Sequence, residues 1–431
     1  MSKFNIILLI VFTLAAILAV LFFSGLIPGF GLGGSGPKAN LVFWGAIDSR
    51  EMEPIIAQLN QDKKNNFSIQ YVEKPASSFE DELINALASS SGPDMWLLSQ
   101  DLILKHEDKV FTIPYSNNLS ERNFKDAFIS EADLFTSPSG IIGFPFTIDP
   151  IVLYWNKDLY EGNGISGPPE YWDEFLVNAP LFNRFDEAGN IIQSGAALGE
   201  FSNIKNAKEI VSMLILQTGN SIVDLKNKKI VFNEREGSLL PPAESAVKFY
   251  NQFSDPAKNS YVWNRGLDDS RQLFSSGKLA NYFGFASDFK VIKSLNPHLN
   301  FDVALVPQVK DGNLTATFGR MEAIVISKAS KNINAAFSAA YLLSSASSIK
   351  LAQENLLLPP VRRDIIKEGA DSPEMAIFYK AALQSKGWLE PDPKAVSDIF
   401  KDMMESSAVG KLRIYEAVRQ ANDRLDKLLK N

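Results

Sequence analysis

Strand-like and helix-like stretches alternate between residues 40 and 98, and this alternation limits the fold more than any other feature of the sequence. Short apolar runs are typical of buried strands, whereas the stretches between them repeat apolar side chains at helical spacing. The strands are expected at residues 40–44, 68–72 and 94–98, and the helices at residues 51–60 and 79–87. Two consecutive strand–helix–strand units predict an α/β fold with a parallel sheet covered by helices on both faces.

Ligands of such sheets bind where the parallel strands end. The carboxyl ends of the expected strands are residues 44–48 and 98–101, and both stretches contain an aspartate. Asp94, which opens the third strand, is expected to be structural. The sequence therefore places a candidate ligand site at this edge of the sheet.

The middle of the chain has a different pattern. Residues 142–160 form two extended runs interrupted by Pro145 and by Asp149-Pro150. Proline restricts the preceding residue to extended conformations, so this stretch suits a chain that crosses between two lobes. Asp149 lies in no expected helix and is therefore not expected to cap one. Helical and strand-like stretches alternate again after it, and the chain is mostly helical from residue 335 onward.

Length and composition exclude several classes of protein. A chain of 431 residues, 45% hydrophobic and 22% charged, is an ordinary globular protein of two or three compact units. The net charge is -7, and no stretch of the chain concentrates basic residues. Nucleic acid is therefore not an expected partner. The absence of cysteine excludes disulfides and thiolate sites, and two histidines leave no basis for a metal cluster. No metal and no cofactor are expected.

The N-terminal segment predicts a membrane anchor. Residues 4–37 carry no charge, and residues 6–23 are an apolar run broken only by Thr13. A helix of this length covers about 27 Å, close to the ~30 Å hydrocarbon core of a bilayer. Residues 1–27 are therefore expected to be a single-pass transmembrane helix, residues 28–38 a flexible linker, and the rest extracytoplasmic. A cleaved signal peptide and a buried core helix are the alternatives.

Sequence signals of catalysis are missing. The chain has no GxSxG, HExxH, P-loop or CxxC motif, so no enzymatic activity is expected. Neither His106 nor His298 has a motif around it, and both are expected to be solvated. The adjacent Asp268 and Asp269 precede a helical stretch, where an N-terminal cap is a better explanation than paired catalytic carboxylates.

Aromatic residues give a positive signal. The chain has 30 Phe, 6 Trp and 11 Tyr, and several of them lie at strand ends or in loops. These include Trp44, Phe201, Trp263, Phe285 and Trp388. A sugar has an apolar C–H face that stacks on a ring and hydroxyls that bond to carboxylates, so rings with Asp or Glu beside them predict a carbohydrate site. The alternative is that each ring belongs to the core.

Several segments together carry a family resemblance. The most specific piece is YWNKDLY followed by PPEYWDEF. The segments are LVFWG (41–45), SSSGPDMW (89–96), IGFPFTIDPIVLYWNKDLY (142–160), GPPEYWDEF (167–175), SGAALGEFS (194–202), FSSGKLANYFG (274–284), VALVP (303–307), GRMEAIVIS (319–327) and LLPPVRRD (357–364). In this order they resemble the extracellular solute-binding proteins of ABC importers, in the large sugar-binding family that includes maltose-binding protein.

The resemblance implies a periplasmic-binding-protein type fold, with two α/β lobes joined by crossing strands and a hinge. The first lobe is expected at residues 39–147 plus about 322–357, and the second at residues 148–321 plus about 358–431. It also implies an extracytoplasmic receptor, monomeric, that captures a carbohydrate in the interlobe cleft and delivers it to an ABC transporter permease. A membrane-anchored receptor that signals to another membrane protein, and a glycoside hydrolase, are the alternatives.

The resemblance and the aromatic signal together predict the ligand-binding residues. Asp149 is expected at the first crossover with its carboxylate facing the ligand, and Phe285 stands where the family often has a stacking tryptophan. The predicted residues are Trp44, Asp48, Asp149, Trp263, Phe285, Arg320 and Trp388. No lipid-modified cysteine is present, so membrane attachment is expected through the N-terminal helix.

Overall fold

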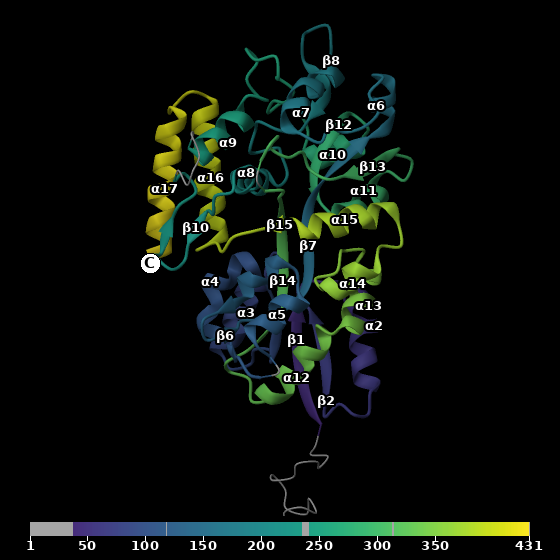
Figure 1. Cartoon of the computed structure of the whole chain (residues 1–431), viewed down its shortest axis with the longest axis vertical. Helices are drawn as coiled ribbons and strands as arrows, with labels where there is room; N and C mark the ends of the chain where they lie inside the picture. The colour runs from purple at the N-terminus through teal and green to yellow at the C-terminus, as the bar shows by residue number, and fades with distance from the viewer. Residues whose placement is uncertain (1–37, 118, 235–240, 313, 431) are drawn as a thin grey trace, which may run out of the picture.

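A computed structural model of the chain describes residues 38–117, 119–234, 241–312 and 314–430. The predicted membrane-spanning helix and nearly all of the predicted linker lie outside these residues. Within the described ranges, no helix has the length and apolar character needed to cross a bilayer. The molecule is elongated and consists of two lobes stacked along its long axis (Figure 1).

The first lobe begins with the predicted alternation of strands and helices. Its elements are β1 (Ala39–Gly45), α2 (Ser49–Gln61), β2 (Phe67–Glu73), α3 (Phe79–Ala88) and β3 (Met95–Ser99). β1 pairs in parallel with both β2 and β3, which confirms the predicted parallel sheet. Asp48 is the N-cap of α2, where its side chain accepts from the Arg50 amide, and the helix buries Ile55, Ile56 and Leu59 on one face.

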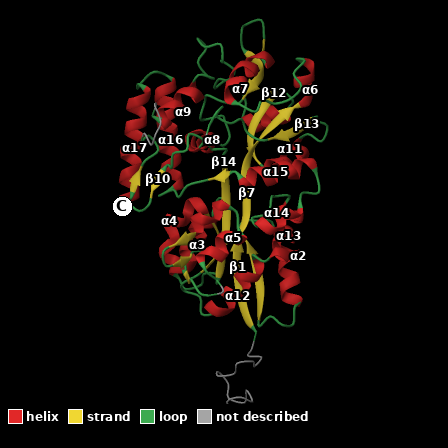
Figure 2. Cartoon of the chain, in the orientation of Figure 1, coloured by secondary structure: helices red, strands yellow, loops and turns green. Residues whose placement is uncertain are grey.

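The rest of the first lobe consists of short elements and three helices that return from the C-terminal part of the chain. The short elements are η1 (Gln100–Leu102), α4 (Ile103–His106), η2 (Glu107–Lys109), β4 (Ile113–Pro114), α5 (Glu121–Ala127), η3 (Ser130–Phe135), β5 (Thr136–Ser137) and β6 (Gly140–Ile141). The returning helices are α12 (Ile333–Leu343), α13 (Ala346–Leu356) and α14 (Arg363–Glu368). Helices thus lie around the strands of the lower lobe (Figure 2).

Two long strands cross between the lobes. β7 (Phe144–Asn156) and β14 (Thr317–Ile326) pair antiparallel and run along the long axis of the molecule (Figure 1). The expectation of two separate extended runs was wrong, because β7 is continuous through Pro145 and Pro150. The register of this pair shifts between Glu322 and Ala323, so a bulge beside Pro145 absorbs the irregularity that the proline introduces.

The second lobe extends the same sheet. Its strands are β8 (Arg184–Phe185), β9 (Ile191–Ala196), β12 (Leu279–Phe285) and β13 (Phe301–Ala304), with a hairpin of β10 (Val223–Asp224) and β11 (Lys229–Ile230), and β15 (Ser385–Lys386) beside β14. Its helices are α6 (Lys157–Gly162), α7 (Trp172–Asn178), η4 (Ala179–Phe182), α8 (Ala207–Leu216), α9 (Pro242–Asn251), α10 (Ser270–Ser275), α11 (Asp288–Leu295), α15 (Pro373–Leu383), α16 (Pro393–Ala408) and α17 (Ile414–Lys430).

Each lobe has its own hydrophobic core. The first-lobe core ends at Ile148 on β7 and at Met321 on β14, whereas the second-lobe core begins at Ile151 and ends on β14 at Phe318. The two cores therefore part at the same level on both crossing strands. After β14 and the returning helices, the first-lobe core also includes Val361, Ile365, Ala382 and Leu389, all beyond the predicted change of lobe near residue 358. The predicted lobe ranges remain a prediction.

Hydrogen bonds join the lobes beside the crossing strands. The side chain of Gln100, from the first lobe, donates to the Gly319 carbonyl at 2.8 Å and accepts from the Met321 amide at 3.0 Å. The buried carboxyl of Glu131 accepts from the Gly387 amide at 3.0 Å. A Cβ at position 387 would lie 1.9 Å from Gln100 Nε2, so any residue other than glycine would displace the Gln100 and Glu131 side chains that join the lobes here.

The Glu131 carboxyl, which joins the lobes, is expected to make the stability of the folded chain depend on pH. Burial raises the pKa of Glu131 from 4.5 to about 8, against the lowering effect of the Gly387 amide. The folded chain therefore binds this proton more tightly than the unfolded chain, and the stabilisation is lost as pH rises from 4.5 towards 8. Glu131→Gln keeps the acceptor and removes the titration. Between pH 4.5 and pH 8, the free energy of unfolding of the parent is expected to fall by up to about 1.4 kcal/mol per pH unit relative to that of the variant. Urea unfolding near pH 5 and pH 8 measures this difference, and equal slopes for the two proteins would contradict it.

Candidate functional site between the lobes

Three of the predicted residues meet where the two cores part. Asp149 and Arg320 are register partners on β7 and β14. The guanidinium of Arg320 lies over the ring of Phe285, 4.4 Å from its centroid, and its Nη2 atom is 3.2 Å from Glu209 Oε1 on α8. We call Asp149, Glu209, Phe285 and Arg320 the hinge cluster. The Arg320 side chain is 40% exposed, so a ligand can reach it.

Asp149 is bonded differently from the prediction. Its Oδ1 accepts from the Ser287 amide at 3.0 Å, and Ser287 directly precedes α11. As expected, Asp149 lies in no helix, but β7 brings its carboxylate to Ser287, the residue before a helix far along the chain. Burial raises the pKa of Asp149 to about 6, against the lowering effects of the Ser287 hydrogen bonds and of Arg320.

Two further carboxylates lie on the first-lobe side of the hinge cluster. Glu322 follows Arg320 on β14, and its Oε2 accepts from Thr147 Oγ1 at 3.3 Å. Asp101 lies in η1, directly after β3, and its buried Oδ1 has no hydrogen-bond partner among the described residues. Burial alone would lower the pKa of Arg320, but the surrounding carboxylates, led by Glu209 and Asp101, raise it. Asp101 lies in the stretch at the carboxyl end of a strand where the sequence predicted a ligand site, although it was not among the predicted site residues.

A buried ion pair lies beside the cluster. Lys208 Nζ, at the start of α8, is 2.8 Å from both carboxylate oxygens of Glu390 and 3.8 Å from Glu209 Oε1. Both members of the Lys208–Glu390 pair are buried. Burial raises the pKa of Glu390 to about 8, against the lowering effect of Lys208. The sequence does not predict this pair, because its members are far apart in the chain and neither lies in a motif.

Trp44 and Asp48 belong to the first lobe and have other partners. Trp44 is 9% exposed, and Lys74 Nζ lies 4.1 Å from the centroid of its ring. Asp48 binds the Arg50 side chain and amide at the start of α2, and these hydrogen bonds lower the pKa of Asp48 to about 2. The structure does not bring either residue into contact with the hinge cluster.

Trp263 and Trp388 lie in the second-lobe core. Trp263 is 0% exposed, and its indole Nε1 donates to Asn203 Oδ1 at 3.0 Å. Trp388 is 3% exposed and stacks on Phe400 with 6.2 Å between the ring centroids. Neither position supports the expected stacking on a ligand, and the alternative that these rings are core describes both. A tryptophan in a loop can pack into the core or stack on a ligand. Sequence alone does not separate these two roles.

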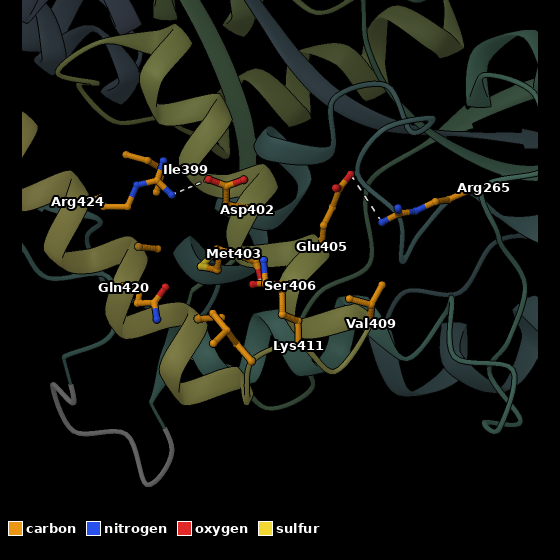
Figure 3. Close-up of a pocket in the computed structure, with 13 residues that line it drawn as sticks. Arg265, Ile399, Asp402, Met403, Glu405, Ser406, Val409, Lys411, Gln420 and Arg424 are labelled. Carbon is orange, nitrogen blue, oxygen red and sulfur yellow. Dashed lines mark hydrogen bonds and ion pairs between the residues drawn. The ribbon is translucent and has the colours of Figure 1, made fainter.

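A cavity of about 590 Å³ lies away from the hinge cluster, between α16 and α17 (Figure 3). Four of its charged side chains form two pairs, with Arg424 Nη1 2.7 Å from Asp402 Oδ2 and Arg265 Nη2 3.7 Å from Glu405 Oε1. None of the predicted ligand-binding residues lines it. In the described part of the chain, no group of His, Asp and Glu side chains is placed to hold a metal ion.

Two α/β lobes with separate cores, joined by crossing strands and carrying charged acceptors where they part, define a two-lobed ligand-binding protein. The comparisons with known proteins agree with this class. The chain belongs to the bacterial extracellular solute-binding protein family, whose model matches residues 46–348. This is a family of binding proteins and not of enzymes, and the resemblance noted in the sequence is confirmed.

Individual relatives are distant. A putative binding protein of Brucella abortus is 23% identical over 366 residues, covering 81% of this chain and 82% of the relative. The maltooligosaccharide ABC transporter solute-binding lipoprotein of Streptococcus pneumoniae is 23% identical over 291 residues, covering 62% of this chain and 63% of the relative. The crystal structure of the cyclic alpha-maltosyl-1,6-maltose binding protein from Arthrobacter globiformis matches with a TM-score of 0.74 at 16% identity, covering 92% of this chain and 100% of that one. The two-lobe fold is therefore shared.

Proposed function

We propose that this protein captures a carbohydrate, a sugar or an oligosaccharide, between its lobes and delivers it to the permease of an ABC transporter. Membership of a solute-binding family supports capture of a solute. Two distant relatives, the maltooligosaccharide ABC transporter solute-binding lipoprotein of Streptococcus pneumoniae and the galactooligosaccharide-binding protein of Bacillus subtilis, support a carbohydrate. No observation among the described residues favours the alternatives, a signalling receptor or a glycoside hydrolase.

The hinge cluster is the observation that carries the proposal. Arg320 offers guanidinium donors on an aromatic ring, while Asp149 and Asp101 offer carboxylate acceptors beside it. A sugar needs both, because each hydroxyl donates one hydrogen bond and accepts others. The cluster lies where the cores part, so a ligand bound there touches both lobes. Of the predicted binding residues, we propose Asp149, Phe285 and Arg320 as direct contacts, with Trp44 and Asp48 on the first-lobe side.

A thermal-shift screen of the full-length chain tests the ligand class. The panel contains maltohexaose, galactooligosaccharides and mannotriose, with amino acids and polyamines as the non-sugar arm. A ligand that binds only the folded chain stabilises it by about 2.7 kcal/mol at a hundred times its Kd. At least one sugar is expected to raise Tm in a concentration-dependent way. Stabilisation by the non-sugar arm alone would overturn the carbohydrate assignment.

We also propose that the N-terminal helix stays in the membrane. Residues 6–23 are apolar enough to span a bilayer, and the sequence after them has no convincing cleavage site. The full-length chain is expected in the membrane fraction, with the lobes outside the cytoplasm, whereas a chain beginning at Lys38 is expected to be soluble and monomeric. Intact-mass analysis of the purified protein checks this expectation. A mature N-terminus beyond residue 23 would contradict it.

A further inference from the structure

Two ion pairs join the lobes on opposite sides of the crossing strands. Lys105 Nζ, from α4 of the first lobe, lies 3.1 Å from Oδ2 of Asp392, which caps α16 of the second lobe. Lys290 Nζ, from α11 of the second lobe, lies 2.9 Å from Oε1 of Glu51 in α2 of the first lobe. In Figure 1, α4 and α16 lie to the left of β7 and β14, and α2 and α11 lie to the right. We call these two contacts the flanking pairs.

Both flanking pairs adjoin the hinge cluster. Asp392 follows two positions after Glu390, a member of the buried ion pair beside the cluster. Lys290 follows three positions after Ser287, whose amide donates to Asp149. A ligand held at the hinge cluster therefore has a flanking pair on each side of it.

Lys105 is shared between two carboxylates. Its Nζ also lies 2.7 Å from Glu80 Oε1, within the first lobe. Hydrogen bonds to Glu80 and to Asp392 raise the pKa of Lys105 against the effect of its partial burial, so its ammonium stays charged. The same Glu80 oxygen is 3.3 Å from Nε2 of His106, which is 2% exposed. The expectation from sequence that His106 is solvated was wrong, because the short helix α4 turns this side chain into the lobe.

Lys290 is also held by two groups of the opposite lobe. Besides Glu51, its Nζ donates to the carbonyl of Asn355 in α13 at 2.6 Å, and Asn355 Nδ2 donates to the Glu51 carbonyl at 3.2 Å. The charged side chains of both flanking pairs are between 32% and 36% exposed. Water and dissolved salt therefore reach all four of them.

The flanking pairs depend on how the lobes are arranged. Because each pair takes one charge from each lobe, lobes that part about the crossing strands pull these charges away from one another. Salt weakens exposed pairs, since the Debye length falls from about 10 Å at 0.1 M to about 3 Å at 1 M, whereas buried pairs are screened much less. A salt-dependent lobe arrangement would therefore report on the flanking pairs and not on the buried pair of Lys208 and Glu390.

We propose that the flanking pairs are made when the lobes close on a ligand and are broken when the lobes part. Glu51, Lys105, Lys290 and Asp392 are then positioning residues for capture. This inference rests on the proposed carbohydrate function and adds that the affinity for an uncharged sugar falls with ionic strength. The sugar has no charge for salt to screen, but the pairs raise the population of the closed arrangement that binds it and so lower the apparent Kd.

A double variant removes one charge from each pair and keeps the shape of the side chains. Asp392→Asn retains an N-cap oxygen for the Ala395 amide, which Asp392 accepts at 2.8 Å, and Glu51→Gln retains an acceptor for Lys290. We call Glu51→Gln/Asp392→Asn the flank variant. An exposed ion pair changes an equilibrium constant by up to about fivefold. The flank variant is therefore expected to bind sugar about three- to tenfold more weakly than the parent at about 0.1 M NaCl.

Titration calorimetry on the full-length chain measures this difference. The titrant is whichever of maltohexaose, mannotriose or the galactooligosaccharides raises Tm most. Between about 0.1 and 1 M NaCl, the affinity of the parent is expected to fall by about the same three- to tenfold, and that of the flank variant to stay constant. A parent whose affinity does not change with salt, or a flank variant that keeps the salt dependence of the parent, would overturn the proposal.

Glu368→Gln/Asp402→Asn is the matched control, because it removes the same two kinds of charge from pairs within one lobe. Glu368 Oε2 lies 3.1 Å from Lys350 Nζ in the first lobe, and Asp402 Oδ2 lies 2.7 Å from Arg424 Nη1 in the second. The control is expected to bind sugar as the parent does and with the same salt dependence. A control that loses the salt dependence would also overturn the proposal, since pairs within a lobe would then produce it.

The lobe arrangement without sugar separates this proposal from the function on which it rests. The chain has no cysteine, so Lys64→Cys and Glu187→Cys allow one spin label at an exposed position of each lobe. Raising NaCl from about 0.1 to 1 M is expected to broaden the distribution of label-to-label distances in the parent, and the flank variant is expected to be broad at both concentrations.

The two readouts fail independently. A label-to-label distribution that neither salt nor the flank variant changes would overturn the flanking pairs, and carbohydrate capture would stand on the thermal-shift screen. If the distribution responds as expected but no sugar in the screen stabilises the chain, carbohydrate capture is rejected, and with it the expected effect of the flanking pairs on sugar affinity.

Discussion

Replacing Asp149 by alanine is expected to weaken carbohydrate binding at least tenfold. A hydrogen bond from a sugar hydroxyl to a charged carboxylate contributes about 1.5–3 kcal/mol, which corresponds to roughly ten- to a hundredfold in affinity. The variant also loses the acceptor for the Ser287 amide at the start of α11. A modest fall in Tm is therefore expected alongside the loss of affinity. Calorimetric titration with the most stabilising sugar from the screen, paired with a melting curve, measures both effects.

Asp269→Ala is the matched control for this variant. Asp269 caps α10 in the same lobe by accepting from the Arg271 and Gln272 amides, at 3.0 and 3.4 Å. Its removal is expected to cost about 1 kcal/mol of stability, as for a lost helix cap, and to leave binding unchanged. If Asp149→Ala binds sugar as the parent does, its proposed contact with the ligand is wrong. If Asp269→Ala loses as much affinity, the effect of Asp149 is indirect.

Removing Lys208 is expected to have the largest effect on stability. Its ammonium is the partner of the Glu390 carboxylate, and both side chains are buried. Breaking a buried ion pair by removing one partner costs about 3–5 kcal/mol, because an uncompensated charge remains. Lys208→Met is therefore expected to lower the free energy of unfolding by about this amount near pH 8. The loss is expected to shrink at lower pH, where Glu390 can take up a proton in place of its lost partner.

The double variant Lys208→Met/Glu390→Leu isolates the pair. Replacing both members of a buried ion pair with apolar side chains of similar size is often neutral or stabilising. The double variant is therefore expected to recover most of the stability that Lys208→Met loses, as measured by urea unfolding. A double variant as unstable as Lys208→Met would show that the two side chains are not energetically coupled.

The local periodicity of the sequence predicted the elements that depend on it. The expected strand at residues 40–44 is β1, and the expected helix at residues 51–60 lies within α2. These predictions succeed because apolar spacing and helix caps act over a few residues. Continuity of β7 through its prolines was not predicted, because the pairing with β14 that maintains the strand comes from a distant part of the chain.

The candidate site was harder to predict, because its geometry arises from long-range pairing. Register between β7 and β14 places Asp149 opposite Arg320, and no local pattern encodes that register. Trp263 and His106 show the complementary problem. An aromatic ring in a loop and a histidine in a polar stretch are both buried here by elements that pack over them. Sequence patterns identify residue types suited to a site, but tertiary packing decides which of them face it.

Solution X-ray scattering tests the central claim, that a carbohydrate binds between the lobes, most directly. The cores part at Asp149-Pro150 and at Gly319-Arg320, so the lobes are expected to move as rigid bodies about these points. A ligand that contacts both lobes stabilises the closed population. For a chain beginning at Lys38, saturation with the most stabilising sugar is predicted to reduce the radius of gyration. An unchanged radius at saturation would contradict capture by closure of the lobes.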